Sequence, residues 1–438
     1  MHQHVFAVFR ASLTASLLVL AACAHSAVRT GNSLAADARS PRGNWEGELR
    51  FPGDVPLFIE VAIDSTATGW RGTLASPELG NDPIIFTSVV AGRDSVVLQL
   101  PPSAQSFVLR AALSPDGMRL DGVAEGPDSG TFRIGRAGSA DAVAISAEAK
   151  RVVESRRVAA AMIDTTHAAP QPNPDSAHLV TSDIPLFWAT VDAAPADSLG
   201  AYLQHRYLER GSIGVRDFIP GRILSGEDLA AYVATHRAQY DSVRAANLDV
   251  TRADSAIRAA FWRLKRLYPN AVFPDVYFVV GRFNSGGTSS RHGLLIGAEK
   301  YRDPSALPGI VSHELIHYEQ HCKAPTLLEH AFMEGSADFV GELISGRQIN
   351  NAAHEYGMAH EHELWHEFTP RFADSTYYPW MYGRPRDGRP NDLGYFIGYR
   401  IAQAYYNRAP DKTQAVHDII TACGSNVAEL LAKSGYAP

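Results

Sequence analysis

The stretch HELIH at residues 313–317 decides the architecture of the C-terminal half of the chain. On a helix, His313 and His317 lie four residues apart on one face, close enough together to bind a single zinc ion. Glu314 then points about 100° around the helix axis, toward the open coordination position of that ion. The stretch therefore predicts a helix that presents two metal ligands and one acid–base group.

A second amphipathic helix is predicted for residues 327–344. Glu334 lies 17 residues beyond His317, a separation that suits an antiparallel helix returning a carboxylate to the metal. Asp338 follows one turn later on the same face, where it can accept the other imidazole N–H of His313 and so fix the tautomer. The two helices together predict a metal site with a supporting carboxylate.

The sequence holds a second match to the same pattern, HELWH at residues 362–366. It lies in a run crowded with histidine and glutamate, and no glutamate follows Glu367 until Glu429. Because a nearby glutamate ligand is missing, this match is interpreted as the solvated face of a helix. His321 and His330 are likewise expected to be exposed or hydrogen-bonded histidines that bind no metal.

Length and charge narrow the classes of protein that fit. The chain has 438 residues, 40 Lys and Arg against 47 Asp and Glu, and 45% hydrophobic residues. At about 100 to 200 residues per domain, this length predicts two or three domains. A net charge of −7 lacks the basic surplus of a phosphate-binding surface, so nucleic acid is not an expected partner. No later run approaches the roughly 18 to 20 apolar residues that a membrane helix needs, which excludes a polytopic membrane protein.

The N-terminus has the features of a targeting segment. A short apolar run ends in LAAC at residues 20–23, which resembles the lipobox of bacterial lipoproteins. This predicts a signal peptide over residues 1–22, a lipidated Cys23 and a polar tether over residues 23–42. The protein would be an exported lipoprotein of the bacterial cell envelope that touches the membrane through its lipid only. Ala24 in place of Asp favours the outer membrane if the cell is Gram-negative.

The alternative for this segment is an ordinary secretory signal with a coincidental cysteine. Both interpretations place the protein outside the cytoplasm, where disulfide bonds form. Cys322 and Cys423 are the other two cysteines of the chain. Whether they pair is left open.

An all-β domain is predicted for residues 43–137. Short alternating apolar runs separated by turn residues are typical of a small barrel or sandwich. This segment contains no histidine and no cysteine, so metal or thiol chemistry is not expected in it. Its opening, GNWEG at residues 43–47, resembles the calycin-like barrels that precede catalytic domains in some exported bacterial enzymes. We interpret the domain as a binding or spacer module.

A linker with one candidate helix, residues 138–176, is expected to join this domain to the remainder of the chain, residues 177–438. Helical periodicity dominates the second part. Helices are predicted for residues 199–208, 226–246 and 252–267. Two strand-like runs follow, residues 276–280 and 293–297, which with the glycine-rich turn between them predict a hairpin or small sheet. The expected fold is an all-β domain followed by a mostly helical α+β domain.

The pair HELIH and EGSAD, residues 313–317 and 334–338, resembles the active site of gluzincin metallopeptidases, the clan of thermolysin and the zinc aminopeptidases. Within that clan the chain is most similar to the predicted Zn-dependent proteases of exported bacterial lipoproteins. The resemblance runs from about residue 187 to the C-terminus and includes the segment 276–299 and GYFIGY at residues 394–399. One departure is Glu319, which stands where the clan has an uncharged or apolar residue.

The resemblance implies roles for individual residues. His313, His317 and Glu334 would bind one Zn²⁺ per chain and leave its fourth position to water. Glu314 would be the general base, because bound zinc lowers the pKa of water toward about 7 and polarises the scissile carbonyl.

The oxyanion that forms on the scissile carbonyl needs a further hydrogen-bond donor. The candidates are Tyr395 and Tyr399, one turn apart on a helix predicted for residues 392–406, and the choice between them is left open. In the clan, the strand before the metal helix pairs with the substrate backbone. That implies peptide binding by strand addition along Gly293, Leu294, Leu295 and Ile296.

The sequence thus predicts zinc-dependent hydrolysis of peptide or protein substrates by an exported, lipid-anchored enzyme. The rival from another class is a non-catalytic envelope lipoprotein in which zinc is only structural. Three ligands and a base favour catalysis, because structural sites are usually closed by four protein ligands. Hydrolysis of another amide or an ester is a further alternative. Endo- or exopeptidase action, cleavage specificity, the role of the β-domain and the oligomeric state are left open.

Overall fold

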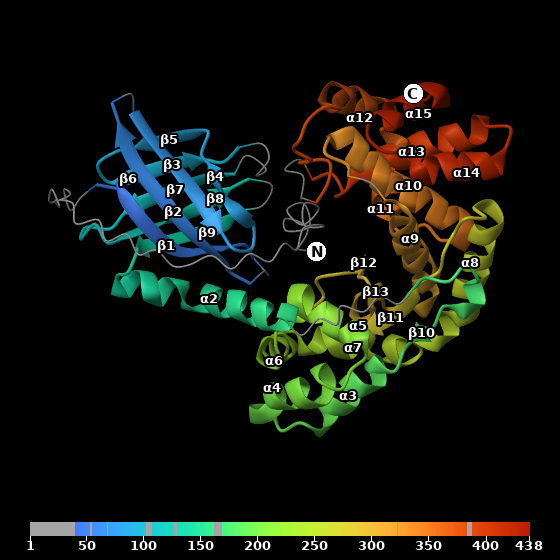
Figure 1. The fold of residues 1–438 in the computed structure, drawn as a ribbon, viewed down its shortest axis with the longest axis horizontal. Coiled ribbons are helices and arrows are strands. Elements are labelled where there is room, and N and C mark those ends of the chain that lie inside the picture. The colour runs from blue at the N-terminus through green and yellow to red at the C-terminus, as the bar shows by residue number, and fades with distance from the viewer. Residues whose placement is uncertain are drawn as a thin grey trace. The chain divides into compact units, whose positions relative to one another are not determined.

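The structure is a computed structural model that describes residues 40–438 except 53–54, 68, 102–106, 127–128, 162–168, 322 and 383–387. The chain divides between Val153 and Glu154 into two compact units, each described by itself (Figure 1). The predicted signal peptide, lipidated Cys23 and most of the tether lie outside the described residues. The division falls inside the expected linker, residues 138–176.

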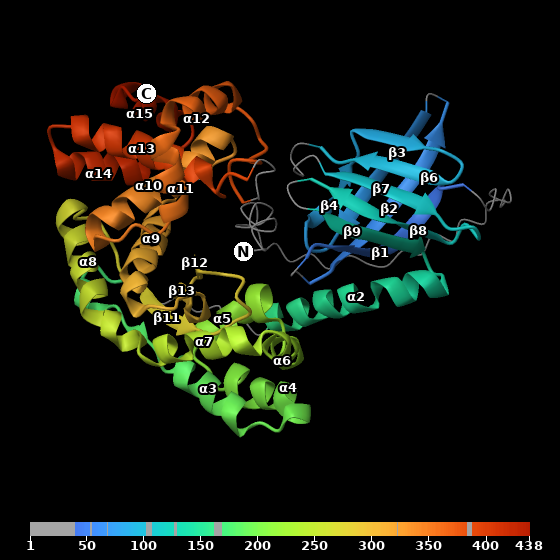
Figure 2. The same cartoon turned by 180° about the vertical axis from the view of Figure 1, so that it is seen from behind.

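The first unit is one antiparallel sheet of nine strands, curved into a half-barrel (Figure 2). Its spatial order is β4-β3-β2-β1-β9-β8-β7-β6-β5, so two meanders meet where β1 pairs with β9. The strands are β1 (Gly43–Arg50), β2 (Leu57–Thr66), β3 (Gly69–Ser76), β4 (Gly80–Ile85), β5 (Ser88–Ala91), β6 (Ser95–Gln99), β7 (Val108–Leu113), β8 (Arg119–Glu125) and β9 (Gly130–Arg136). This confirms the predicted β-domain.

Alternation of side chains gives the half-barrel its core. In β2, Ile59, Val61 and Ile63 are buried while Glu60 and Ala62 between them are exposed, as the period of two along a strand requires. A helix follows the last strand, α2 (Ala140–Ala161), which contains most of the candidate helix predicted for the linker. Because Gly135 has no side chain, the backbone of α2 can approach the last strand closely at Ala142.

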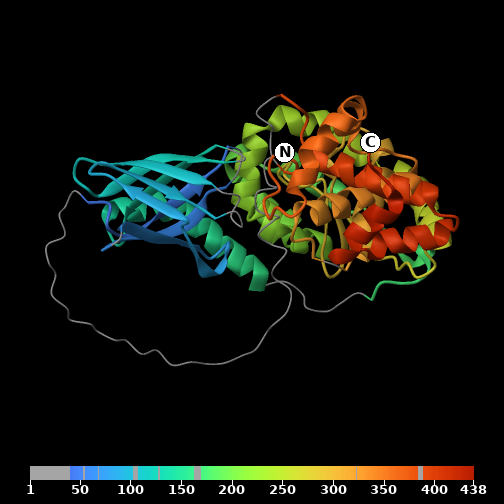
Figure 3. The same ribbon diagram turned by 90° about the horizontal axis from the view of Figure 1, so that it is seen from above.

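The second unit is mostly helical and contains a small four-stranded sheet (Figure 3). Its helices are α3 (Asp183–Ala193), α4 (Leu199–Tyr202), α5 (Ile213–Phe218), α6 (Gly226–Thr235), α7 (Arg237–Leu248), α8 (Asp254–Leu267), α9 (Leu307–Glu319), α10 (Leu327–Ser345), α11 (Asn351–Ala359), α12 (Glu361–Phe368), α13 (Leu393–Arg408), α14 (Lys412–Thr421) and α15 (Ser425–Ser434). The single helix predicted for residues 226–246 is two helices, α6 and α7, separated at His236. The α+β expectation for this part of the chain is confirmed.

The small sheet differs from the predicted hairpin. Its order is β10 (Leu179–Val180), β11 (Asp275–Val279), β13 (Gly293–Gly297) and β12 (Gly287–Ser289). The two predicted strands, β11 and β13, run parallel to each other, and the antiparallel partner of β13 is β12. Of the two arrangements expected, the hairpin is wrong and the small sheet is confirmed, because the three-residue strand β12 begins at the end of the glycine-rich stretch and pairs with β13.

The described part of the chain contains no helix that is both long and apolar enough to cross a bilayer.

Candidate metal centre

Helix α9 carries the two predicted histidine ligands through the core of the second unit. Val311, Leu315 and Ile316 are fully buried, and most other residues of the helix are buried too. Burial on nearly every face is expected of a helix that runs through a protein interior. The polar groups His313 and Glu314, 6% and 8% exposed, are therefore held in a poorly hydrated environment.

Helix α10 supplies the third predicted ligand, and its ends are well defined. A capping box opens it: the Thr326 hydroxyl accepts the Glu329 N–H, and the Glu329 carboxylate accepts the Thr326 N–H. Gly346 closes it in the left-handed conformation, with φ of 71°, which glycine adopts at little cost. These signals fix the helix over almost the range that the sequence predicts.

Close packing of α10 on α13 fixes where Glu334 lies. A side chain on Gly335 would overlap the backbone of α13 at Tyr399, and a side chain on Gly398 would overlap the backbone of α10 at Ala331. The two helices are in contact at both glycines. Gly335 directly follows the metal-facing Glu334 in the sequence, and Gly398 lies on α13, across the helix interface. The small residue that follows Glu334 is therefore needed for the approach of the two helices.

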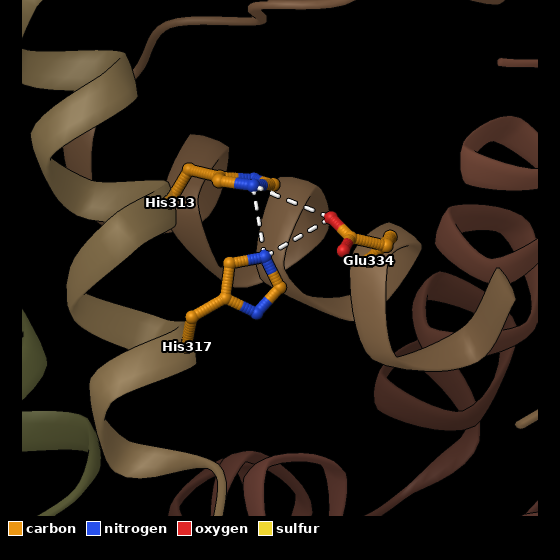
Figure 4. Close-up of side chains that lie close together, drawn as sticks. All are labelled: His313, His317 and Glu334. Carbon is orange, nitrogen blue, oxygen red and sulfur yellow. Dashed lines mark hydrogen bonds and ion pairs between the residues drawn. The ribbon is translucent and has the colours of Figure 1, made fainter. Parts of the chain in front are cut away.

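His313, His317 and Glu334 converge on one point (Figure 4). His317 Nε2 lies 3.0 Å from both His313 Nε2 and Glu334 Oε2, and His313 Nε2 lies 3.6 Å from Glu334 Oε2. Donors at the usual zinc bond lengths of about 2.0 to 2.2 Å in a tetrahedron would be about 3.3 to 3.6 Å apart. The spacing and the chemistry of this donor set fit Zn²⁺.

Each histidine is held from behind, so that Nε2 faces the metal position. His313 Nδ1 lies 2.8 Å from Asp338 Oδ1, the partner that the spacing predicts, and Asp338 Oδ2 accepts a hydrogen bond of 2.6 Å from the Asn350 amide. His317 Nδ1 lies 2.8 Å from Gln320 Oε1. Such partners set the tautomer and orientation of ligating histidines.

The orientation of Gln320 is itself fixed. Its amide nitrogen donates to the Met333 carbonyl at 3.1 Å and to the Ser336 hydroxyl at 3.0 Å. The amide oxygen must then face His317, which makes Nδ1 of that ring the donor and leaves Nε2 free for a metal. Sequence reasoning missed Gln320 and Asn350, although Gln320 follows His317 by three residues and so lies on the same face of the chain.

The pKa values of the two glutamates of the site are shifted in opposite directions. Burial acts to raise the pKa of Glu334, but the adjacent His317 and His313 outweigh it and hold the pKa well below its usual range. Burial raises the pKa of Glu314, although the same histidines oppose the shift. Glu334 is therefore a carboxylate ligand, whereas Glu314 has the higher proton affinity that a general base needs.

Glu314 lies directly against the edge strand β12. A Cβ atom on Gly287 would be 2.5 Å from Glu314 Cγ and 2.7 Å from Cδ, and closer still to Oε1. Only glycine leaves room for the Glu314 side chain at this point. The glycine-rich stretch before the metal helix thus forms part of the site.

The two predicted tyrosines have different surroundings. The ring of Tyr395 lies nearly parallel to that of His313, with 6.4 Å between centroids, and its hydroxyl is hydrogen-bonded to Tyr382. The hydroxyl of Tyr399 instead donates to Glu342 Oε2 at 3.0 Å. Both hydroxyls therefore have a partner, and of the two candidates it is Tyr395 whose ring lies beside the ligand His313.

Tyr382 is a residue of the site that sequence reasoning missed. Its hydroxyl donates to Glu334 Oε1 at 2.8 Å and lies 2.6 Å from His330 Nε2. His330 is thus hydrogen-bonded, as expected. No periodic pattern marks Tyr382, because it lies outside the helices, 48 residues beyond Glu334.

The predicted substrate strand requires a correction. Leu294, Leu295 and Ile296 pair with β11 on one side and with β12 on the other. Strand addition needs an unpaired edge, so Gly293–Gly297 cannot bind a peptide in this way. The edge of the sheet beside Glu314 is β12.

The second HELWH match is a solvated helix face, as predicted. His362 and His366 are exposed, and Arg389 forms ion pairs with Glu363 at 3.1 Å and Glu367 at 2.7 Å. Among the described residues, the one cluster with three metal-ligating groups is His313, His317 and Glu334.

Two further features bear on the sequence expectations. The unusual Glu319 is buried, accepts the Val272 N–H at 2.7 Å, and has its pKa raised by burial to about 7. Burial therefore favours the neutral form of this departure from the clan pattern, whereas the Val272 hydrogen bond acts in the opposite direction. Cys423 is disulfide-bonded, and Cys23 and Cys322 lie outside the described residues.

Comparison with known proteins agrees with this geometry. Residues 281–421 match a family model described as Predicted Zn-dependent protease (DUF2268). No curated protein and no solved structure matched the chain. The matched segment contains α9, α10 and the whole of α13 with its tyrosines, and the half-barrel lies outside it. The C-terminal region, with its two histidines and glutamate around one point, is therefore similar to the predicted Zn-dependent proteases.

Proposed function

We propose that the protein hydrolyses peptide bonds with a Zn²⁺ ion held by His313, His317 and Glu334. The observation that carries this proposal is the convergence of three donors beside Glu314, two buried and His317 partly buried, with an edge strand next to it. Three donors leave a fourth coordination position open, which is the arrangement of catalytic rather than structural zinc sites. The non-catalytic alternative would need a fourth protein ligand, and the cluster in the described part of the chain has three.

When bound at this site, Zn²⁺ lowers the pKa of a coordinated water and polarises the scissile carbonyl. Glu314 accepts the proton of the attacking water and passes it to the leaving amine nitrogen, as general bases of this kind do. Tyr395, beside His313, donates to the carbonyl oxygen as negative charge develops on it. Asp338 and Gln320 hold the two imidazoles in place throughout.

The substrate binds in extended form along β12. This strand is the edge of the small sheet, and Gly287 within it lies against Glu314. A peptide that adds to this edge has its backbone beside the general base, while main-chain hydrogen bonds supply affinity. Recognition through the backbone fits peptide substrates better than isolated amides or esters.

A matched pair of variants tests the function. Glu314→Gln removes the base from HELIH, and Glu363→Gln makes the same change in HELWH. We expect Glu314→Gln to keep stoichiometric zinc and to lose about 10² to 10⁴ of peptidase activity, measured on a peptide library by mass spectrometry. Glu363→Gln should match the wild type. Full activity of zinc-loaded Glu314→Gln would contradict the mechanism.

We also propose that the enzyme is exported and anchored through lipid on Cys23, in the outer membrane if the cell is Gram-negative. The support is the LAAC stretch at residues 20–23. Mass spectrometry of the mature N-terminus should find a diacylglycerol-modified Cys23, and Cys23→Ala should move the protein from the membrane to the soluble fraction. A mature chain that begins elsewhere and carries no lipid would support the ordinary secretory signal.

A further inference from the structure

We propose that Tyr382 is a positioning residue that holds Glu334 as a one-oxygen ligand and so keeps the metal's remaining position open. The inference rests on the proposed zinc site. The two oxygens of Glu334 face different partners: Oε2 lies 3.0 Å from His317 Nε2, whereas Oε1 accepts the Tyr382 hydroxyl at 2.8 Å. One oxygen is thus directed to the metal and the other is occupied by a hydrogen bond.

His330 fixes the Tyr382 hydroxyl from the other side. Its Nε2 lies 2.6 Å from the hydroxyl oxygen, and its ring stacks on Tyr377, with centroids 4.3 Å apart and planes 10° from parallel. His330 also hydrogen-bonds the Ala324 backbone carbonyl, so a neutral ring that donates there offers Nε2 as an acceptor and competes with Glu334 for the single Tyr382 proton. The buried imidazole, 8% exposed, holds the hydroxyl oxygen beside Glu334 Oε1.

The backbone also holds Tyr382 in place. Tyr382 and Asp392 both adopt left-handed conformations, with φ of 57° and 63°, which are unfavourable for residues other than glycine. The Tyr382 N–H donates to Asp392 Oδ1 at 2.8 Å. The two residues with unfavourable backbone conformations are thus hydrogen-bonded to each other. Strain of this kind persists where surrounding contacts over-determine the conformation, commonly at functional sites.

The Tyr382 hydrogen bond bears on how many oxygens of Glu334 would bind the metal. A carboxylate released from Tyr382 can bind through both oxygens, which would fill the position that a water or a carbonyl oxygen requires. The hydrogen bond therefore controls coordination number as well as affinity. This is a role for Tyr382 that acts through Glu334, without contact with the reacting atoms.

Tyr382→Phe in the full-length protein tests the inference, with Tyr377→Phe as the matched control. The control removes a hydroxyl from the same segment, one that donates to the Ala324 carbonyl at 3.0 Å and lies outside the ligand set. We expect Tyr382→Phe to raise the zinc dissociation constant about 10- to 100-fold in chelator competition. The visible absorption of the Co²⁺-loaded variant should weaken, because five-coordinate Co²⁺ absorbs less strongly than tetrahedral Co²⁺. Tyr377→Phe should change neither quantity.

An unchanged zinc affinity and Co²⁺ spectrum in folded Tyr382→Phe would overturn the inference while leaving the proposed function intact. Failure of the wild type to bind zinc would overturn both. If Tyr382→Phe does not fold, as judged by thermal melting of the metal-free protein, His330→Phe replaces it, since it keeps the stacking on Tyr377 but removes the ring nitrogen that competes with Glu334 for the Tyr382 proton. A lower zinc dissociation constant is expected there, and no change would again overturn the inference.

Discussion

Gly287 is the point at which the edge strand and the general base meet, and Gly287→Ala places one methyl group between them. The added Cβ would lie 2.5 Å from Glu314 Cγ, whereas ordinary van der Waals contact begins at 3.4 Å. Glu314 or the strand must therefore move by about 3.4 − 2.5 = 0.9 Å. A displacement of about 1 Å at a catalytic group can cost 10²-fold in rate, or about 2.7 kcal/mol in the activation barrier.

Three measurements on this variant distinguish a displaced Glu314 from lost metal binding and from impaired folding. Peptidase kcat should fall about 10²-fold, while zinc content and thermal stability stay close to those of the wild type, because no metal ligand and no core residue is altered. Ser289→Ala on the same strand, at an exposed position, is the control and should retain activity. Wild-type kcat in Gly287→Ala would refute the placement of Glu314 against β12. Loss of zinc from the variant would contradict the expectation that a change in β12 leaves metal binding intact.

Three further outcomes follow from the site and its surroundings. Gln320→Leu removes the partner of His317 Nδ1 and should weaken zinc binding about 10- to 100-fold in chelator competition, and an unchanged affinity would contradict the assigned tautomer. Tyr395→Phe should lower kcat by more than tenfold while Tyr399→Phe, whose hydroxyl bonds Glu342, should change it less than threefold; equal effects would remove the distinction between them. Burial raises the pKa of Glu299 from 4.5 to about 7, so the folded state favours its protonated form, and the unfolding free energy should fall as pH rises from 4.5 to 7, by about 3 kcal/mol. Urea unfolding of Glu299→Gln should lack this fall, and a parallel pH dependence in both proteins would contradict the burial argument.

The sequence predicts the parts of the site that depend on the spacing of residues within one helix or strand. Two histidines four residues apart, and a glutamate and an aspartate one turn apart, define faces of helices whatever the rest of the chain does. For that reason the ligands and the Asp338 contact could be located before the structure was known. The half-barrel is predicted for a similar reason, because alternation in β2 is visible in one segment.

The remaining features depend on contacts between distant segments. Strand β12 has three residues, too few to show a period, so the sequence does not predict it, and the expectation of peptide addition along residues 293–297 rests on the family resemblance alone. Tyr382 reaches Glu334 from a segment outside regular structure, and no spacing rule connects the two. The distinction between Tyr395 and Tyr399 depends on Glu342, since both tyrosines lie on the same face of α13 and differ only in the neighbours they meet.

Zinc stoichiometry tests the central claim most directly. Elemental analysis of the purified protein should find one zinc per chain, lost in His313→Ala and retained in His362→Ala, because only the first histidine belongs to the three-donor cluster. The same preparations assayed on a peptide library should show hydrolysis by the wild type and by His362→Ala. No zinc in the wild type, or zinc lost only in His362→Ala, would contradict the account.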